Sequence, residues 1–439
     1  MNDQAWTETT LGALIDVEHG WPFQSLLFSE ELSGRPIVVA VGNFRYSGGF
    51  RFDSTTVKEY RGDYPREFEL SAGDILLVMT CQTPGGEILG IPARVPNDGR
   101  IYLHNQRLGK VVLQRPDLAD IDFLYFLFLS REFNDELVAS STGTKIVHTA
   151  PSRIEAFRFS LPPLGTQRAI AALLRAIDEK ISSNEDSARS LGTLATMLFS
   201  SWFVDFDPVT AKRASERPFG VPAHAIDLFP SHFEESAIGP IPQGWRVLPL
   251  DSVADFRNGL ALQRYPPRDA DVLPVIKIAE LRARSNAGAD LCSGVPPEYV
   301  IDDGDVIFSW SGSLMVDVWC GGEGALNQHL FKVTSRKVPN WFYLGWLNEH
   351  LPEFQAIAAD KATTMGHIRR FHLTDAKVLV PPEPLMKAMT SVQQPLLDQI
   401  IHNRLEARTL AELRDTLLPP LLSGELTIKS AEKTVGAAL

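Results

Sequence analysis

The chain has 439 residues, which is too long for one ordinary hydrophobic core and predicts two or more domains. Its composition, with 44% hydrophobic and 22% charged residues, is that of a soluble globular protein, and no apolar run reaches the ~20 residues of a membrane-spanning helix. The formal net charge of −12 excludes a surface that is basic everywhere, but it allows a local basic face for nucleic acid.

The N-terminal residues and the cysteines bear on the location of the protein. The first ten residues, MNDQAWTETT, contain acids and no basic segment, so they do not resemble a signal peptide. The three cysteines, Cys81, Cys292 and Cys320, lie far apart and include no CxxC pair. Neither a disulfide framework nor a zinc site is therefore expected, and a cytoplasmic location is the default prediction.

In chain order, strand-rich segments alternate with helical ones. Runs such as PIVVAVG, GDILLVM and KVVL, separated by Gly, Pro and Asn, predict strands, and a Pro-Pro pair then precedes a helical pattern. A Pro-rich stretch ending in IGPIPQGW lies near the middle of the chain. The expected parts are a first strand-rich domain (1–162), a helix (163–207), a connector (208–244), a second strand-rich domain (245–381), a second helix (382–423) and a tail (424–439).

The two strand-rich domains and the helices that follow them are copies of one another. Pro162 closes the segment FRFSLPPL and Pro381 closes AKVLVPPE, and 381 minus 162 gives an offset of 219. The same offset aligns Thr144 with Thr363, His148 with His367, Asn184 with Asn403, Leu191 with Leu410 and Leu198 with Leu417. Gly20 and Asn105 correspond to Gly259 and Asn327 at other constant offsets, as insertions in loops would produce. The chain is a tandem duplication.

Both helices carry a seven-residue repeat of apolar residues. In the first helix the two core positions take Leu174, Ile181, Ala188, Ala195, Trp202 and Ile170, Ile177, Asn184, Leu191, Leu198. In the second they take Ile400, Ala407, Arg414, Leu421 and Met389, Leu396, Asn403, Leu410, Leu417. This period is typical of a coiled coil, although two amphipathic helices that each pack on their own domain remain the alternative.

An antiparallel pairing of these helices would bring their midpoints together. Asn184 and Asn403 lie near those midpoints, so we expect their side chains to face one another and to fix the register of the pair. Pro395 is expected to kink or restart the second helix. Two similar domains held apart by such a rod suit DNA half-sites that lie one or more helical turns apart, at ~34–36 Å per turn.

Several segments are similar to a known family. The segments SLPPLGTQRAIAALLRAIDEKI, SSWFVDFDPV and LRDTLLPPLLSGEL resemble the two spacer segments in specificity subunits of type I restriction-modification systems, and the similarity extends over essentially the whole chain. It implies an α+β fold with two similar target-recognition domains in a pseudo-twofold arrangement, separated by an antiparallel two-helix coiled coil. Each domain would read one half of a bipartite, asymmetric DNA site. The family members are non-catalytic.

The resemblance also implies partners and cofactors. Two methyltransferase subunits would dock on the coiled coil, and restriction subunits, which are motor and nuclease in one, would join them on double-stranded DNA. This chain would hold no cofactor, whereas the methyltransferase would use S-adenosylmethionine and the restriction subunit ATP and Mg²⁺. No membrane association is expected. The resemblance does not tell which DNA bases each domain reads, because recognition domains are exchanged between relatives.

Catalytic motifs give no support to an enzyme. The nearest approach to the [ND]PP[YF] motif of adenine methyltransferases is the stretch from Tyr265 to Arg268, which lacks both ends of it, and no GxxxxGK[ST] phosphate loop occurs. Two other readings remain open. One is a DNA methyltransferase with its own recognition domain, and the other is a protein-only adaptor, which the negative charge would suit.

Candidate DNA-binding residues lie on loops in matched pairs. In the first half they are Arg45, Tyr46, Thr80, Gln82, Thr83, Asn105, Gln106, Arg107, Lys145 and His148. In the second half they are Arg264, Lys277, Arg282, Arg284, Ser311, Ser313, Asn327, Gln328, His329, Thr364, His367, Arg369 and Arg370.

These candidates carry different expectations. Asn105 and Asn327 could equally make a local turn hydrogen bond. The residues that follow them are stronger candidates for base reading, because the turn differs between the halves; they are Gln106, Arg107, Gln328 and His329. The matched residues His148 and His367 suit a phosphate contact or a structural hydrogen bond. Arg282 and Arg284 could be merely solvated charges, and the expected phosphate contacts are Lys145, Arg369 and Arg370.

The aromatic stretch SSWFVDFDPV ends the first helix. Trp202 continues the apolar seam and is expected to be structural. Phe203 and Phe206 lie off the seam and would either pack on the nearby recognition domain or dock a methyltransferase subunit. Asp207 precedes Pro208 and is interpreted as a helix stop, and no metal site is expected here.

Overall fold

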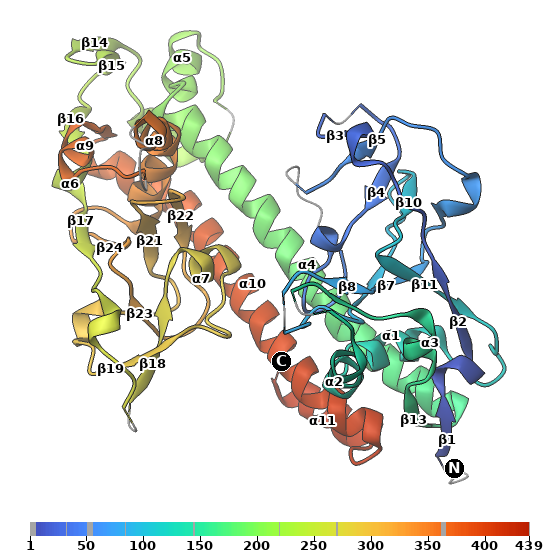
Figure 1. Ribbon diagram of the computed structural model, residues 1–439. Coiled ribbons are helices and arrows are strands. Elements are labelled where there is room, and N and C mark those ends of the chain that lie inside the picture. Colours follow the sequence, from blue (N-terminus) through green and yellow to red (C-terminus); the bar gives the residue numbers. More distant parts are fainter. Residues whose placement is uncertain are drawn as a thin grey trace. The chain divides into compact units, whose positions relative to one another are not determined.

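The computed structural model describes residues 6–31, 33–50, 56–83, 85–143, 145–218, 220–268, 271–360 and 366–438 (Figure 1). They form two compact units, of which unit 1 comprises Met1–Glu179 and Ala411–Leu439 and unit 2 comprises Lys180–Leu410. Below, domain 1 denotes the described residues up to 162, in unit 1, and domain 2 denotes those from 245 to 381, in unit 2. Both units combine strands with helices, as the α+β prediction requires.

Domain 1 is built on two sheets. A four-stranded antiparallel sheet has the order β2-β11-β7-β9, and a five-stranded mixed sheet has the order β3-β5-β4-β10-β6. The short pairs β1-β13 and β8-β12 complete it. The elements are β1 (Thr7–Thr10), β2 (Ile15–His19), β3 (Phe28–Ser29), β4 (Ile37–Val39), β5 (Glu59–Tyr60), β6 (Glu69–Leu70), β7 (Ile75–Val78), β8 (Thr80–Cys81), β9 (Pro92–Arg94), β10 (Tyr102–His104), β11 (Leu108–Leu113), α1 (Ile121–Phe128), α2 (Arg131–Ser140), β12 (Val147–His148), α3 (Pro151–Glu155) and β13 (Arg158–Leu161).

Domain 2 repeats this plan. Its four-stranded antiparallel sheet has the order β17-β24-β21-β22, its second sheet has the order β19-β18-β23-β20, and β16 pairs with β25. The elements are β16 (Arg246–Pro249), α6 (Leu250–Val253), β17 (Asp255–Asn258), β18 (Val272–Ile276), α7 (Ile278–Ala283), β19 (Leu291–Ser293), β20 (Val300–Ile301), β21 (Val306–Ser309), β22 (Met315–Val318), β23 (Gly324–Leu326), β24 (Leu330–Thr334), α8 (Asn340–Asp360), α9 (Arg370–Asp375) and β25 (Lys377–Val380).

The strand registers agree with the duplication residue by residue. Equivalent strands pair through residues that the sequence offsets align, so the repeat extends to the hydrogen-bonding pattern of the sheets. The equivalent pairs are Thr7 with Leu161 and Arg246 with Val380, and Val17 with Val111 and Phe256 with Val333.

Two long helices follow the domains. They are α4 (Leu164–Phe203), of 40 residues, and α10 (Glu383–Ser423), of 41 residues. Within unit 2 they run antiparallel, since Asn184 Nδ2 donates to Glu406 at 2.8 Å and Gln393 Nε2 donates to the Ala195 carbonyl at 3.1 Å. Every predicted seam residue is buried or half-buried. The predicted antiparallel helix pair is therefore confirmed.

The second helix does not restart at Pro395. α10 runs unbroken through this residue, so of the two expected outcomes the restart is wrong, whereas the kink stays a prediction. The neighbouring Gln393 and Leu397 are 3% and 5% exposed, so packing on the buried side holds the helix on either side of the proline. Tertiary contacts here outweigh a local helix breaker.

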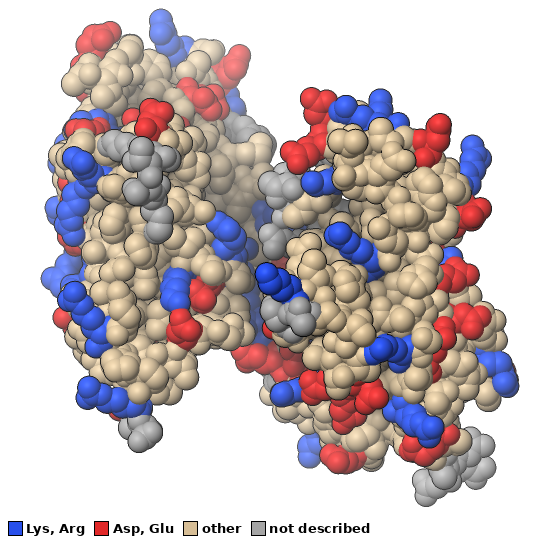
Figure 2. Space-filling view, in the orientation of Figure 1, with Lys and Arg blue, Asp and Glu red and all other residues tan. Residues whose placement is uncertain are grey.

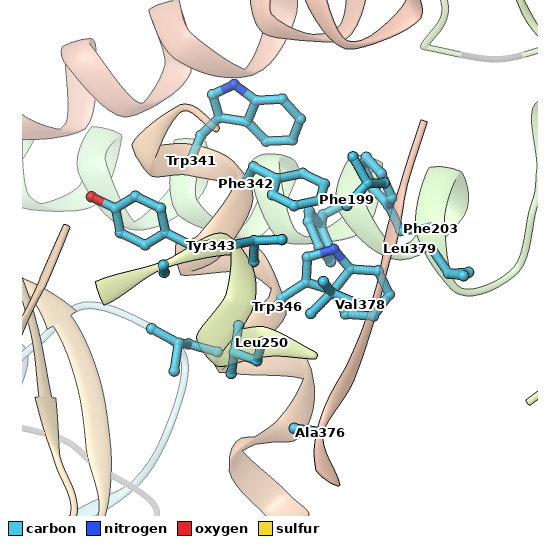
Figure 3. Close-up of a cluster of buried hydrophobic side chains, with 14 of the residues drawn as sticks. Phe199, Phe203, Leu250, Trp341, Phe342, Tyr343, Trp346, Ala376, Val378 and Leu379 are labelled. Atoms are coloured by element: carbon cyan, nitrogen blue, oxygen red, sulfur yellow. The ribbon is translucent and has the colours of Figure 1, made fainter. Parts of the chain in front are cut away.

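The end of α4 is buried in the core of unit 2. The Phe203 ring contacts Phe199 at 4.7 Å and Trp346 at 5.9 Å between ring centroids, and it is 1% exposed (Figure 3). Strand β25 and the short helix α6 contribute Leu379 and Leu250 to the same cluster. At ~25 cal/mol per Å² of apolar surface, such aromatic side chains are among the largest contributors to the stability of unit 2.

The connector between α4 and domain 2 is folded. The first helix ends at Phe203, four residues before the predicted stop, and Phe206 takes a left-handed φ of 54°. Asp207 and Pro208 begin a new helix, α5 (Asp207–Arg213), because proline is well suited to a first helical turn. The hairpin β14 (Phe233–Ser236) and β15 (Gly239–Pro242) follows, and the tail forms α11 (Ile428–Ala438).

Candidate nucleic-acid interface

In domain 1, three segments far apart in sequence meet at one place, which we term site 1. The turn at residues 105–107 meets the end of β7, where the Met79 N–H donates to the Arg107 carbonyl at 2.9 Å. The Thr149 N–H donates to the Met79 carbonyl at 3.0 Å, and β12 pairs His148 with Thr80. Backbone hydrogen bonds thus fix the positions of the turn, the strand end and the histidine segment together.

Domain 2 repeats this arrangement at site 2. The Trp310 N–H donates to the His329 carbonyl at 3.3 Å, and the Ile368 N–H donates to the Trp310 carbonyl at 3.0 Å. A β-bridge joins Ser311 to His367. These are the repeat counterparts of the contacts at site 1, so the duplication has retained the backbone framework of the site.

Two glycines explain how each turn is held. Gly20 and Gly259 precede residues that form parallel bridges to Asn105 and Asn327. A Cβ at Gly20 would lie 2.3 Å from Asn105 backbone atoms, and a Cβ at Gly259 would lie 2.2 Å from the Asn327 carbonyl oxygen. Close backbone approach therefore requires glycine at both positions, and it explains the sequence match between them.

The asparagine of each turn has a local role. Asn105 Oδ1 accepts from the Arg107 N–H at 3.0 Å, and Asn327 Oδ1 accepts from the His329 N–H at 3.2 Å. The alternative of a local turn hydrogen bond is therefore confirmed for both. The next two side chains differ in exposure between the sites, since Gln106 and Arg107 are exposed whereas Gln328 and His329 are half-buried.

The hydroxyl at each strand end supports a histidine. Thr80 Oγ1 lies 3.0 Å from His148 Nδ1, and Ser311 Oγ lies 2.8 Å from His329 Nδ1. Thr80 is 6% exposed and Ser311 is 3% exposed. We therefore correct both from DNA contacts to supporting residues, because a buried hydroxyl that is already hydrogen-bonded is poorly placed to reach a base.

Site 2 has a tryptophan at its strand end, where site 1 has a methionine. The indole of Trp310 lies 6.3 Å from both the His329 and the His367 rings, and its Nε1 donates to Asn258 Oδ1 at 2.9 Å. Gln328 Nε2 lies 3.3 Å from His329 Nε2, so the imidazole links the Ser311 hydroxyl to the Gln328 amide. The repeat counterpart of Trp310 is the buried Met79. Trp310 is a site residue that the sequence analysis missed.

Basic side chains predicted in domain 2 differ in availability. Lys277 forms an ion pair with Asp290, which raises the lysine pKa through a hydrogen bond, and Arg284 pairs with Asp317 at 2.6 Å. A phosphate would have to compete with these carboxylates. Exposed Arg282 and Ser313 instead line one hollow of about 470 Å³ beside Gly312 and Gly366.

Arg369 is the N-cap residue of α9, Arg370 is its first residue, and both are exposed. The Arg370 guanidinium donates to the Phe256 carbonyl at 3.2 Å and lies 5.9 Å from the Phe331 ring centroid, which orients it. His367 is half-buried within site 2. Thr364 lies outside the described residues, as do its neighbour Thr363 and Thr144, the repeat counterpart of Thr363.

The remaining candidates are exposed. Lys145 and His148 lie on the β12 side of site 1, and Gln82 and Thr83 follow β8. Tyr46 is 60% exposed, and its turn also carries exposed Arg45. Arg264, at the end of a 3₁₀ turn, is exposed in domain 2. Their exposure is compatible with DNA contact, which for all of these residues stays a prediction.

The two seam asparagines are both buried in the helix pair, and each hydrogen-bonds a residue of the opposite helix. Asn184 donates to Glu406, whereas Asn403 donates to the Ser187 hydroxyl at 3.0 Å and accepts from Gln399. Ser187 and Glu406 are repeat counterparts, so the two contacts are equivalent. Asn184 contacts the residue three positions after Asn403, and Asn403 contacts the residue three positions after Asn184.

The predicted docking role of Phe203 is wrong. Its ring is enclosed by the aromatic cluster of unit 2, which leaves no surface for a partner, so the packing alternative applies. Phe206 is half-buried and contacts Phe233 and Trp245, with ring centroids 5.8 Å and 6.2 Å away. The exposed apolar side chains of this part of α4 are Leu194 and Met197, at 40% and 64%.

The charge of the chain is unevenly distributed. Figure 2 shows Asp and Glu gathered over the lower part of unit 1, and Lys and Arg along the left edge of unit 2 in this view. In unit 1, helix α2 carries the exposed acids Glu132, Asp135 and Glu136. Among the described residues, no His, Cys, Asp and Glu cluster suits a metal ion. In the same part of the chain, no helix is both long and apolar enough to cross a membrane.

Comparison with known proteins identifies this architecture. A family model described as the type I restriction modification DNA specificity domain matches residues 44–191. The MjaIX type I restriction enzyme specificity subunit of Methanocaldococcus jannaschii is 23% identical over 70% of this chain and 69% of its own length. The HindI specificity subunit of Haemophilus influenzae is 21% identical, with 83% and 95% covered.

A solved structure shares the fold over nearly the whole chain. It is the S subunit of a type I restriction-modification system from M. genitalium, with a TM-score of 0.55, 14% identity, and 96% of this chain and 97% of that chain covered. The domain model, the relatives and the duplicated fold agree. This chain is therefore similar to the specificity subunits of type I restriction-modification systems, in sequence over most of its length and in fold.

Proposed function

We propose that this protein is the non-catalytic subunit that gives a type I restriction-modification complex its DNA sequence specificity. Domain 1 reads one half of a bipartite, asymmetric site, and domain 2 reads the other half. The helix pair formed by α4 and α10 sets the spacing between the halves. The relatives named above are specificity subunits, and the similarity of this chain to them supports the proposal.

The paired framework of sites 1 and 2 is the observation that carries this function. Equivalent backbone hydrogen bonds position equivalent turns, yet the side chains differ at the positions that can face a base, Arg107 against His329. Arginine donates two hydrogen bonds to guanine, whereas histidine offers one donor and one acceptor in its neutral form. Such a pair of sites suits two different half-sites better than one palindromic sequence.

The partners follow from the same proposal. Two methyltransferase subunits dock on the helix pair and supply S-adenosylmethionine chemistry, and restriction subunits add ATP- and Mg²⁺-dependent translocation and cleavage. This chain needs no cofactor of its own. It acts by placing the enzyme subunits on the correct DNA sequence.

Met197, rather than Phe203, is the best docking candidate for the methyltransferase on α4. Its apolar side chain is 64% exposed, and Leu194 lies one turn before it. Met197→Glu should reduce the affinity for the methyltransferase subunit by roughly tenfold or more, because a charge would replace an apolar anchor in the interface. Copurification of tagged methyltransferase, with thermal unfolding of the variant as the folding control, measures this. Full copurification would exclude Met197 from the interface.

The function itself is tested by DNA binding. The chain, co-expressed with its methyltransferase subunit, should bind a bipartite duplex in preference to a scrambled duplex of the same composition. The target sequence can be found by methylation-sensitive sequencing of the host genome. A complex without any sequence preference would contradict the proposal and favour a protein-only adaptor. Methylation by this chain alone would favour a methyltransferase.

A further inference from the structure

Two arginines of α10 join the helix to domain 2 by ion pairs within unit 2. Arg404 and Arg408 lie four residues apart and therefore point to the same side of the helix. Their partners, Asp317 and Asp303, come from strand β22 and from the turn before β21. Neither arginine belongs to the apolar seam that pairs α10 with α4.

The first of these contacts is well enclosed. Arg404 Nη1 lies 2.9 Å from Asp317 Oδ1 and also donates to the Val318 carbonyl at 3.1 Å. The side chains of Arg404 and Asp317 are 19% and 11% exposed. Arg284 completes the site at the other carboxylate oxygen. An ion pair with additional hydrogen bonds and little solvent is costly to break from one side.

The second contact has a two-point geometry. Arg408 Nη1 and Nη2 lie 2.8 Å from the two carboxylate oxygens of Asp303, and Nη1 also donates to the Cys320 carbonyl at 2.8 Å. Burial would raise the pKa of Asp303, but hydrogen bonds from Arg408 and from the Gly322 amide outweigh it and lower the pKa. Bidentate pairing fixes orientation as well as distance.

The first half of the duplication lacks the residues for this contact. The repeat counterpart of Arg404 is Glu185, and that of Arg408 is Arg189, which pairs with Asp186 of its own helix at 2.7 Å. Ala72 precedes the glycine that matches Gly304, and Ala93 pairs with β7 as Asp317 pairs with β21. Alanines thus stand where domain 2 has both acids.

We propose that Arg404 and Arg408 act as a clamp that fixes domain 2 on α10 and thereby restricts the gap length accepted between the two DNA half-sites. The clamp joins the start of β21 and the strand β22, which flank the segment that carries Trp310 and Ser311 of site 2, to the middle of the helix. A domain held at this point as well as at its chain connection to the helix cannot pivot to follow a displaced half-site. This inference rests on the proposed function.

The test measures binding as a function of gap length. The full chain, co-expressed with its methyltransferase subunit, is titrated with duplexes whose gap is the natural one or about one or two base pairs shorter or longer. In the Arg404→Gln/Arg408→Gln variant, the preference for the natural gap should fall by roughly tenfold, the scale of losing close charge pairs at a fixed interface. Single-base preferences within half-site 2 should be unchanged.

Matched variants separate the possible outcomes. Arg189→Gln, at the repeat counterpart of Arg408, should keep the natural gap preference, and the exchanged pair Arg408→Asp/Asp303→Arg should restore most of it. Arg408→Lys retains the charge but loses the two-point contact, so it should show an intermediate preference even if the double variant folds poorly. An unchanged gap profile, or an equal loss at every gap, would overturn the clamp. Loss of sequence preference in the wild type would instead overturn the proposed function.

Discussion

Sites 1 and 2 share a backbone and differ in chemistry. At both, a turn, a strand end and a histidine segment are joined by equivalent backbone hydrogen bonds. Site 1 presents exposed Arg107, Gln106 and Lys145, whereas site 2 presents half-buried His329 and Gln328 around Trp310. A duplicated fold can therefore hold its framework by glycine and main-chain contacts while the side chains that meet DNA change freely.

The helix attachments of the two domains differ as well. Domain 2 is tied to the middle of α10 through Asp303 and Asp317. In unit 1, α4 contacts domain 1 near its start, where Arg175 lies 3.1 Å from Asp122, and both side chains are more exposed than those of Arg404 and Asp317. Since solvent weakens ion pairs, domain 1 has the weaker electrostatic attachment.

Substitution of the two glycines should have the largest effect on the backbone framework that sites 1 and 2 share. Gly20→Ala and Gly259→Ala should each destabilise their own unit by about 3 kcal/mol, at the upper end for overpacking, because the new Cβ would meet the backbone of the turn. Urea unfolding measures this, and Gly42→Ala, where a Cβ would meet nothing within 4 Å, serves as the control. Tolerance at one site only would show that the frameworks are not equivalent.

The divergent side chains should affect different halves of the DNA. Arg107→Ala should weaken specific binding by about 1–3 kcal/mol and relax one position of the first half-site, and His329→Ala should do so in the second. Binding to a panel of single-base variants of the target measures both effects. A comparable loss for every sequence would reassign the side chain to phosphate contact.

Lys145 is expected to contact a phosphate rather than a base. Lys145→Ala is expected to weaken binding to all sequences by about 1 kcal/mol and to reduce the salt dependence by about one charge. Titrations over a range of salt concentrations measure the slope, and Arg131→Ala, on the acidic helix α2, is the control. A loss limited to one half-site would contradict the phosphate assignment.

The ion pair that attaches domain 2 to α10 through Asp303 should make a small contribution to the pH dependence of stability. The pKa of Asp303 is lowered in the folded state, so its ion pair stabilises unit 2 above the unfolded value of about 4 and loses this effect as the pH falls below it. The stability difference between wild type and Asp303→Asn should therefore be constant from about pH 8 to 5, at about 1 kcal/mol or less, and shrink in more acidic solution. Denaturant unfolding at several pH values measures it; a difference that grows in acid would contradict the assignment.

The sequence predicted the periodic features of the molecule well. Pairs such as Gly20 with Gly259 and the heptads of both helices depend on local spacing, which a single sequence displays. The burial of Phe203, the unbroken helix at Pro395 and the clamp at Arg404 were not predictable in this way. Each depends on partners such as Trp346 or Asp317, which only the folded chain brings near.

At the two sites, the turns and the histidines could be located from the sequence, but it did not show which side chains support others and which are free to contact DNA. Thr80 and Ser311 resembled DNA contacts because hydroxyls can bind bases, and their burial beneath a histidine depends on strand pairing across distant segments. The contribution of Trp310 was concealed because its counterpart, Met79, is an ordinary core residue. Repeat comparison finds what is retained more readily than what one copy has gained.

Unit 1 is built from two segments that lie on either side of unit 2 in the sequence, and this has a consequence for synthesis on the ribosome. Trp6 packs beside Gly424, and Asp178 pairs with Arg414 at 2.8 Å, so unit 1 is completed by a segment that is translated after unit 2. Unit 2 lies between these segments and is contiguous. Domains generally fold as they emerge, so unit 2 can be finished while domain 1 still awaits its final helices, and a truncated product would carry an incomplete first domain beside an intact second one.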